Sequence, residues 1–209
     1  MIELTDNQKN VLTASGHLLV AGGPGSGKTT VSILKAAQVA ENELAPEQKI
    51  LFLSFARATV SRVWEALDES ENVDQEIKKR IVVDTYHSFF WSIIKTHGYL
   101  LELPRKLEVL TPSAEAIALS SIRNDYGANN RLTGEQKQEK EERESAELER
   151  LSTEEGKVCF DLFSGYCASL LHSSIKIREL ISKSYPYVIL DEFQDTSSEQ
   201  WRVVQRIGV

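Results

Sequence analysis

Apolar residues along the chain form short continuous runs and longer stretches with helical spacing. The continuous runs predict strands that are buried on both faces, and they cover residues 17–21, 49–54, 81–84 and 187–190. The spaced stretches predict helices over about residues 28–41, 57–69, 87–97 and 197–207. This alternation of strand and helix indicates an α/β fold, in which helices flank a parallel sheet.

The strand pattern disappears between residues 99 and 184, where helical stretches follow one another. Thr111 and Pro112 suit the N-cap and the first position of a helix. We therefore expect one domain formed by residues 1–98 and 185–209, interrupted by an all-helical insertion over residues 99–184.

The net charge of −7 is concentrated in one part of the insertion. Residues 134–155 contain nine acidic and four basic side chains, so this segment supplies −5 of the total. We expect a solvated helix or mobile segment there, and phosphate repulsion argues against strong duplex DNA binding by it. The remaining chain is nearly balanced and has room for a local basic groove.

The sequence shows no sign of a membrane or secreted protein. The first residues lack a signal-peptide core, and no apolar run approaches about 18 residues. Cys159 and Cys167 have neither metal-ligand nor redox spacing, which favours packed thiols in a reducing compartment. A soluble cytoplasmic protein with no membrane partner is the expectation.

Residues 21–30 read A-G-G-P-G-S-G-K-T-T and contain the phosphate-loop motif G-x-x-x-x-G-K-[ST]. Glycines allow the backbone to curl so that successive N–H groups point at phosphate oxygens. Lys28 is expected to reach the terminal phosphates, and the Thr29 hydroxyl to hold Mg²⁺. The residues expected to contact the nucleotide are Gly22, Gly23, Gly25, Ser26, Gly27, Lys28, Thr29 and Thr30.

A second candidate centre follows the apolar run at residues 187–190, in the sequence D-E-F-Q-D-T. Asp191 is placed to hold Mg²⁺, and Glu192 to orient and deprotonate an attacking water. Two acids after a strand are weakly specific alone. Together with a phosphate loop they indicate hydrolysis of a nucleoside triphosphate.

Near the N-terminus, Thr5 and Gln8 have the spacing of a helix capping box. This structural interpretation of Gln8 competes with a functional one, which depends on the resemblance described next.

The ordered set of motifs resembles the UvrD/Rep family of superfamily 1 DNA helicases over nearly the full length. The segments that carry it are L-T-D-N-Q-K-N-V (4–11), A-G-G-P-G-S-G-K-T-T (21–30), L-F-L-S-F-A-R-A (51–58), V-D-T-Y-H-S-F-F (83–90), V-C-F-D-L-F (158–163) and V-I-L-D-E-F-Q-D-T (188–196). The resemblance implies a RecA-like P-loop NTPase fold that uses ATP and Mg²⁺ to move along single-stranded DNA.

The resemblance also assigns roles to single residues. Gln8 resembles the glutamine that reads the adenine edge. Gln194 resembles the glutamine that senses the terminal phosphate, which completes a catalytic set with Lys28 and Glu192. Positions that match the contacts to single-stranded DNA are Ser54, Phe55, Arg57, Thr85 and His87.

Two departures from the family pattern matter. The family's T-N-K-A after the phenylalanine is replaced here by Ala56, Arg57, Ala58 and Thr59, so an expected lysine is missing. The second motor domain and its arginines are also absent from this sequence, so the fragment alone is expected to bind ATP weakly and hydrolyse it slowly.

Two alternatives stay open: a P-loop NTPase that does not act on DNA, and a non-hydrolysing nucleotide-sensing or interaction module.

Overall fold

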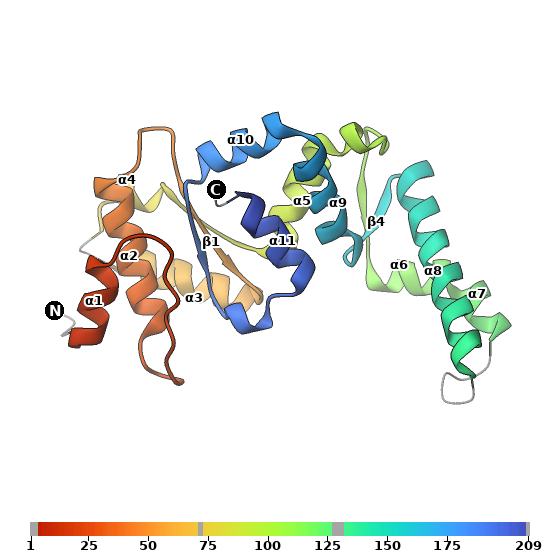
Figure 1. Ribbon diagram of the computed structural model, residues 1–209, viewed down its shortest axis with the longest axis horizontal. Helices are drawn as coiled ribbons and strands as arrows, with labels where there is room; N and C mark the ends of the chain where they lie inside the picture. The colour runs from red at the N-terminus through yellow and green to blue at the C-terminus, as the bar shows by residue number, and fades with distance from the viewer. Residues whose placement is uncertain (1–3, 71–72, 127–131, 208–209) are drawn as a thin grey trace. The chain divides into compact units, whose positions relative to one another are not determined.

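The computed structural model describes residues 4–70, 73–126 and 132–207 (Figure 1). The chain forms two compact units: a first unit of residues 1–86 and 175–209, and a second unit of residues 87–174. The first unit thus combines two segments that are distant in sequence. The predicted domain limits at residues 98 and 184 stay a prediction.

The first unit contains a three-stranded parallel sheet with the strand order β2-β1-β5. This arrangement confirms the predicted α/β fold with a parallel sheet flanked by helices. The elements are α1 (Asp6–Thr13), α2 (Lys28–Asn42), β1 (Ile50–Ser54), α3 (Arg57–Asp68), α4 (Gln75–Lys78), β2 (Ile81–Thr85), α10 (Ile175–Ser184), β5 (Tyr187–Leu190), a 3₁₀ turn (Phe193–Asp195) and α11 (Ser198–Ile207).

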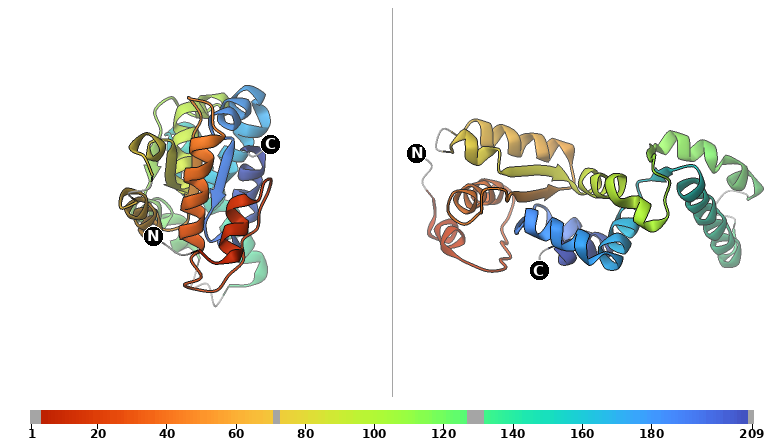
Figure 2. Two further views of the ribbon diagram at one scale, coloured as in Figure 1. Left: turned by 90° about the vertical axis from the view of Figure 1, so that its left-hand side faces the viewer. Right: turned by 90° about the horizontal axis from the view of Figure 1, so that it is seen from above.

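β1 is the central strand, and all five of its residues are buried. Successive side chains of a strand point to opposite faces. Ile50 and Phe52 belong to a core cluster with apolar residues of α2, α3 and β2, whereas Leu51 and Leu53 are buried on the opposite face. Figure 2 shows α3 and the pair α10 and α11 on opposite sides of the sheet.

The strand predicted over residues 17–21 is wrong, because no strand forms there in the structure. Leu18, Leu19 and Val20 are 45, 82 and 39% exposed. An apolar run favours burial, but a strand also needs a neighbouring strand to pair its backbone groups. Within the described residues no strand lies beside this run, and β5 is an edge strand.

The second unit is mostly helical but also contains two short strands. Its elements are α5 (Tyr86–His97), a 3₁₀ helix (Gly98–Leu101), β3 (Glu108–Leu110), α6 (Pro112–Ala118), α7 (Ser120–Asp125), α8 (Gly134–Glu154), β4 (Lys157–Cys159) and α9 (Leu162–Ser173). β3 and β4 pair in parallel, so the expectation of an all-helical segment is corrected. Strands of three residues are too short to show a period in the sequence.

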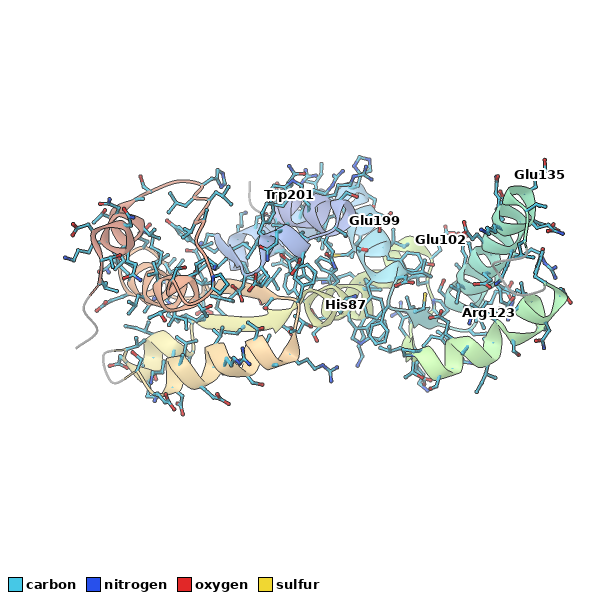
Figure 3. The ribbon with its side chains drawn as sticks, turned by 90° about the horizontal axis from the view of Figure 1, so that it is seen from below. His87, Glu102, Arg123, Glu135, Glu199 and Trp201 are labelled. Carbon is cyan, nitrogen blue, oxygen red and sulfur yellow. The ribbon has the colours of Figure 1, made fainter. Side chains whose placement is uncertain are left out.

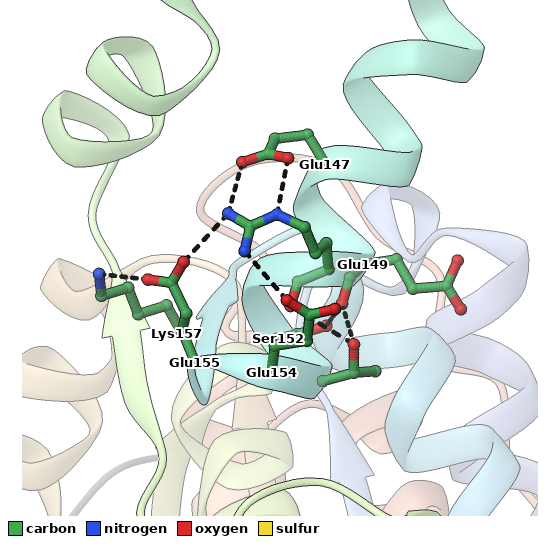
Figure 4. Close-up of polar contacts among 8 residues, drawn as sticks. Glu147, Glu149, Ser152, Glu154, Glu155 and Lys157 are labelled. Carbon is green, nitrogen blue, oxygen red and sulfur yellow. Dashed lines mark hydrogen bonds and ion pairs between the residues drawn. The ribbon is translucent and has the colours of Figure 1, made fainter.

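The acidic segment forms α8, which confirms the predicted solvated helix. Thr133 and Gln136 form a capping box at its start. Arg123 of α7, which Figure 3 labels, pairs with Glu144 of α8. Arg150 binds Glu147, Glu154 and Glu155 (Figure 4). These hydrogen bonds raise the pKa of Arg150 and lower the pKa of Glu147. The pKa of Glu155 is lowered first by its hydrogen bond from Lys157 and then by that from Arg150.

We predict that Leu19→Ser changes the unfolding free energy of this chain by less than about 0.5 kcal/mol, because an exposed side chain contributes little packing. Phe52→Ala, at a fully buried position of β1, should cost about 3–5 kcal/mol. Urea unfolding of both variants measures the difference. A cost for Leu19→Ser comparable to that for Phe52→Ala would show that residues 17–21 are buried after all.

Candidate nucleotide-binding site

The phosphate loop is shaped by two glycines in the left-handed region. Gly25 has φ +75° and Gly27 has φ +79°, and Gly27 is the N-cap residue of α2. Residues with side chains rarely adopt this conformation. The loop therefore turns sharply into the positive end of a helix of 15 residues, where the free N–H groups and the helix dipole suit an anion.

The Lys28 side chain folds back across the loop. Its Nζ donates hydrogen bonds to the carbonyl oxygens of Gly22 at 2.7 Å and Gly23 at 3.2 Å. The ammonium group is thus held at the loop by oxygen acceptors. Phosphate oxygens are acceptors of the same kind but with a negative charge, so they are stronger partners for this group.

Gln8 connects α1 to the phosphate loop. Its Oε1 accepts from the Thr5 N–H at 2.9 Å, and the Thr5 hydroxyl accepts from the Gln8 N–H at 3.3 Å. The capping box is therefore confirmed. The Gln8 Nε2 also donates to the Ser26 carbonyl at 3.1 Å, a contact that no local sequence pattern indicates. The adenine contact stays a prediction.

Asp191 lies directly after β5, and its N–H donates to the Leu53 carbonyl of β1 at 2.9 Å. Burial raises the pKa of the Asp191 carboxyl, and the negative charge of Glu192 raises this pKa further. The positive charge of Lys28 acts in the opposite direction. The structure places Lys28 and Asp191, which are 163 positions apart in the sequence, in the same unit.

Glu192 has a left-handed backbone, with φ 51° and ψ 46°. This conformation is unfavourable for a residue with a side chain and is concentrated at functional sites. Its carboxylate is exposed and accepts a hydrogen bond from Gln194 Nε2. Two predicted catalytic side chains are thus in direct contact.

An open cleft of about 660 Å³ lies between α1 and the phosphate loop. Gln8, Ser26 and Lys28 line it together with the exposed apolar residues 18–20. Its volume is within the range of small-molecule sites. The cleft beside the phosphate loop is therefore lined by both apolar and polar side chains.

The residues present fit a Mg²⁺ ion. Among the described residues no three His, Cys, Asp or Glu side chains form a metal cluster, but Mg²⁺ needs only one or two carboxylates besides waters and substrate phosphates. The half-buried Thr29 is at the start of α2, and Asp191 directly follows β5 in the same unit. Hydroxyl and carboxylate oxygens are suitable ligands for this ion.

The residues predicted to contact DNA divide between the two units. In the first unit, the half-buried Phe55 ring packs against Tyr86, with ring centroids 4.8 Å apart. Arg57 is exposed at the start of α3, whereas Ser54 and Thr85 are buried. His87 belongs to the second unit, where its ring packs edge-on against Phe160 at 5.7 Å.

Tyr86 is a residue whose importance the sequence pattern does not show. Its side chain is fully buried, and its hydroxyl lies 3.1 Å from the Thr196 hydroxyl. It therefore connects the Phe55 ring to the segment that follows the carboxylate pair. The motif V-D-T-Y-H-S-F-F contains Tyr86 but does not indicate these two contacts.

Comparison with known proteins agrees with this arrangement. Residues 4–155 and 115–208 match the family model of the UvrD/REP helicase N-terminal domain. The chain belongs to this family. The two alternatives, another P-loop NTPase and a non-hydrolysing module, are not favoured.

The relatives of this UvrD/Rep domain are much longer than the chain. YjcD of Bacillus subtilis (strain 168), described provisionally as an ATP-dependent DNA helicase, is 29% identical over 98% of the chain, which covers 30% of YjcD. The ATP-dependent DNA helicase Rep of Buchnera aphidicola subsp. Acyrthosiphon pisum (strain APS) is 26% identical over 99% of the chain and 36% of Rep. The ATP-dependent DNA helicase PcrA of Leuconostoc citreum is 21% identical over 95% of the chain and 30% of PcrA. The chain thus spans about a third of the length of these relatives.

No helix in the described part of the UvrD/Rep domain has the length and apolar character needed to cross a membrane.

We predict that Gly27→Ala and Gly25→Ala each destabilise the chain by about 1–2 kcal/mol through the left-handed backbone. A Cβ at residue 27 would also lie 2.8 Å from Gln8 Nε2, whereas a Cβ at residue 25 meets nothing within 4 Å. Gly27→Ala should therefore lose a further 0.5–1.5 kcal/mol, roughly one hydrogen bond. Urea unfolding measures both, and equal costs would show that Gln8 does not brace the loop.

Proposed function

We propose that this chain is the N-terminal ATP-binding part of a DNA helicase that hydrolyses ATP to move along single-stranded DNA. The observation that carries the proposal is that one unit contains both the glycine-shaped phosphate loop at the start of α2 and the carboxylate pair directly after β5, where the Asp191 N–H is bonded to the central strand β1. Phosphate binding alone would suit many proteins. A carboxylate pair beside it adds metal binding and activation of water.

Each side chain of the site has a distinct role in this proposal. Lys28 binds the terminal phosphates, and Thr29 and Asp191 hold Mg²⁺, which neutralises phosphate charge when it is bound. Glu192 orients and deprotonates the attacking water, and Gln194 senses the terminal phosphate through its contact with Glu192. Gln8 reads the adenine with the amide that also holds the loop.

Single-stranded DNA would bind at the carboxyl ends of β1 and β2. The half-buried Phe55 ring rests on Tyr86 and keeps part of its surface for a stacked base. The Ser54 side chain is fully buried, so its contact to DNA would be made by its backbone. Arg57, Thr85 and His87 complete the proposed contacts.

The proposed ATPase needs a second motor domain of the same protein as its partner. In related hydrolases an arginine that contacts the terminal phosphate accelerates hydrolysis by about 10³- to 10⁵-fold, and no residue of this site is placed in that role. This chain by itself should therefore hydrolyse ATP slowly.

We predict that Lys28→Ala lowers ATP affinity at least about 10-fold, because a charge-assisted hydrogen bond contributes about 1.5–3 kcal/mol. Lys35 is a matched control, since it lies on the same helix and also donates to two carbonyl oxygens, those of Leu12 and Ala14. Lys35→Ala should lower the melting temperature and leave ATP affinity unchanged. Calorimetric titration with ATP compares the variants, and undiminished affinity in Lys28→Ala would refute the phosphate-loop assignment.

In the intact protein, Glu192→Gln should retain ATP binding and lose about 10²- to 10⁴-fold in hydrolysis, the contribution of a general base. The amide keeps the size of the side chain but cannot accept a proton from water. Steady-state ATPase assays with and without single-stranded DNA measure the effect. A wild-type rate in this variant would exclude Glu192 as the base.

Phe55→Ala should weaken binding of single-stranded DNA by the intact protein by about 1–3 kcal/mol if one base stacks on the ring. Trp64→Ala removes an aromatic side chain of α3 that is 42% exposed and outside the proposed DNA contacts, so it should leave DNA affinity unchanged. Fluorescence anisotropy with labelled oligonucleotides compares the two. Equal losses would indicate that binding does not depend on stacking at Phe55.

A further inference from the structure

The Ser54 hydroxyl is an unusual group in this domain. Its oxygen is buried, and it is the one such side-chain atom without a hydrogen-bond partner among the residues that the structure describes. Burying a hydroxyl without a partner is unfavourable, because the group loses its hydrogen bonds to water. An alanine would fill nearly the same space without this penalty, so packing alone does not account for a serine here.

The sheet register places Ser54 between two strand ends. Ser54 pairs with Thr85 of β2 on one side. On the other side, Leu53 pairs with Leu190 of β5, and the Asp191 N–H bonds to the Leu53 carbonyl at 2.9 Å. Asp191 is therefore the residue next to Ser54 at this end of β5.

Ser54 and Asp191 are the positions that follow the pair Leu53 and Leu190, and side chains at matching positions of neighbouring strands point to the same face of a sheet. A serine hydroxyl is a donor, and an ionised carboxylate is only an acceptor. The two groups are therefore complementary as donor and acceptor.

We propose that Ser54 is a positioning residue for the metal site, whose hydroxyl donates a hydrogen bond to the Asp191 carboxylate when that carboxylate holds Mg²⁺. The proposal rests on the proposed function of this site. A ligand carboxylate that is hydrogen-bonded by a neighbour loses less orientational freedom when the metal binds, and removing such neighbours commonly weakens metal affinity. Ser54 also precedes Phe55, so one backbone segment would touch both the metal ligand and the DNA.

A metal titration tests the proposal in the intact protein. The probe is Mn²⁺, which has the same preference for oxygen ligands as Mg²⁺, with ADP present and free Mn²⁺ measured by electron paramagnetic resonance. Ser54→Ala should bind Mn²⁺ about 10- to 100-fold more weakly than the wild type. Its affinity for ADP without metal should be unchanged, and its melting temperature unchanged or higher because an unpartnered buried hydroxyl has been removed.

Ser152 provides a matched control, because it is equally buried but its hydroxyl donates to the Glu149 carbonyl at 2.8 Å and contacts the Tyr166 hydroxyl. Ser152→Ala should lower the melting temperature and leave Mn²⁺ affinity unchanged. Asp191→Asn should abolish Mn²⁺ binding in the presence of ADP, which would verify that Asp191 is a metal ligand.

The outcomes distinguish a failure of the positioning role of Ser54 from a failure of the proposed metal site. Unchanged Mn²⁺ affinity in Ser54→Ala, or a joint loss of affinity and melting temperature, would overturn the positioning role alone. Wild-type protein that binds no Mn²⁺ with ADP, or Asp191→Asn that binds it normally, would overturn the metal site and with it the proposed function.

Discussion

The parallel pairing of β1 with β2 on one side and with β5 on the other is the interaction on which the candidate site depends. In a parallel sheet all carboxyl ends lie at one edge, so residues that follow different strands meet there. This pairing places Ser54, Thr85 and Asp191 side by side, although they come from three distant parts of the sequence. Both faces of β1 are buried, so a shift of one residue would exchange the side chains of the two faces and disrupt the packing on each.

The charges at this edge are poorly balanced within the protein. Asp191 is partly buried beside Glu192, and both effects raise its pKa, while Lys28 provides an opposing charge. Among the described residues, the Lys28 ammonium donates its hydrogen bonds to the backbone carbonyls of Gly22 and Gly23. A bound metal would stabilise the carboxylates, and a bound phosphate would give Lys28 a charged partner. The same groups that are unfavourable alone are therefore suited to receive a metal and a nucleotide together.

Local sequence patterns predicted most of the elements in this chain. The capping box of Thr5 and Gln8, the three strands of the sheet and the helix of the acidic segment all form as expected, because each depends on residues close together in sequence. The errors have a common cause. The strand expected at residues 17–21 does not form, and the short strands β3 and β4 were not predicted. Whether a short run becomes a strand depends on a partner strand elsewhere in the chain, and no local pattern contains that partner.

The sequence by itself determined the phosphate loop, the carboxylate pair and membership in the UvrD/Rep family. Each of these depends on residue types at fixed spacings, which can be recognised from the sequence alone. Only the tertiary structure decided which of these residues meet. It placed Lys28 and Asp191 in one unit, joined Gln8 to the loop through Ser26, and buried the Ser54 hydroxyl beside the end of β5. The physical reason is that strand register and side-chain burial are set by long-range pairing. A sequence motif identifies the functional side chains, and the pairing of the strands decides which of them lie close together.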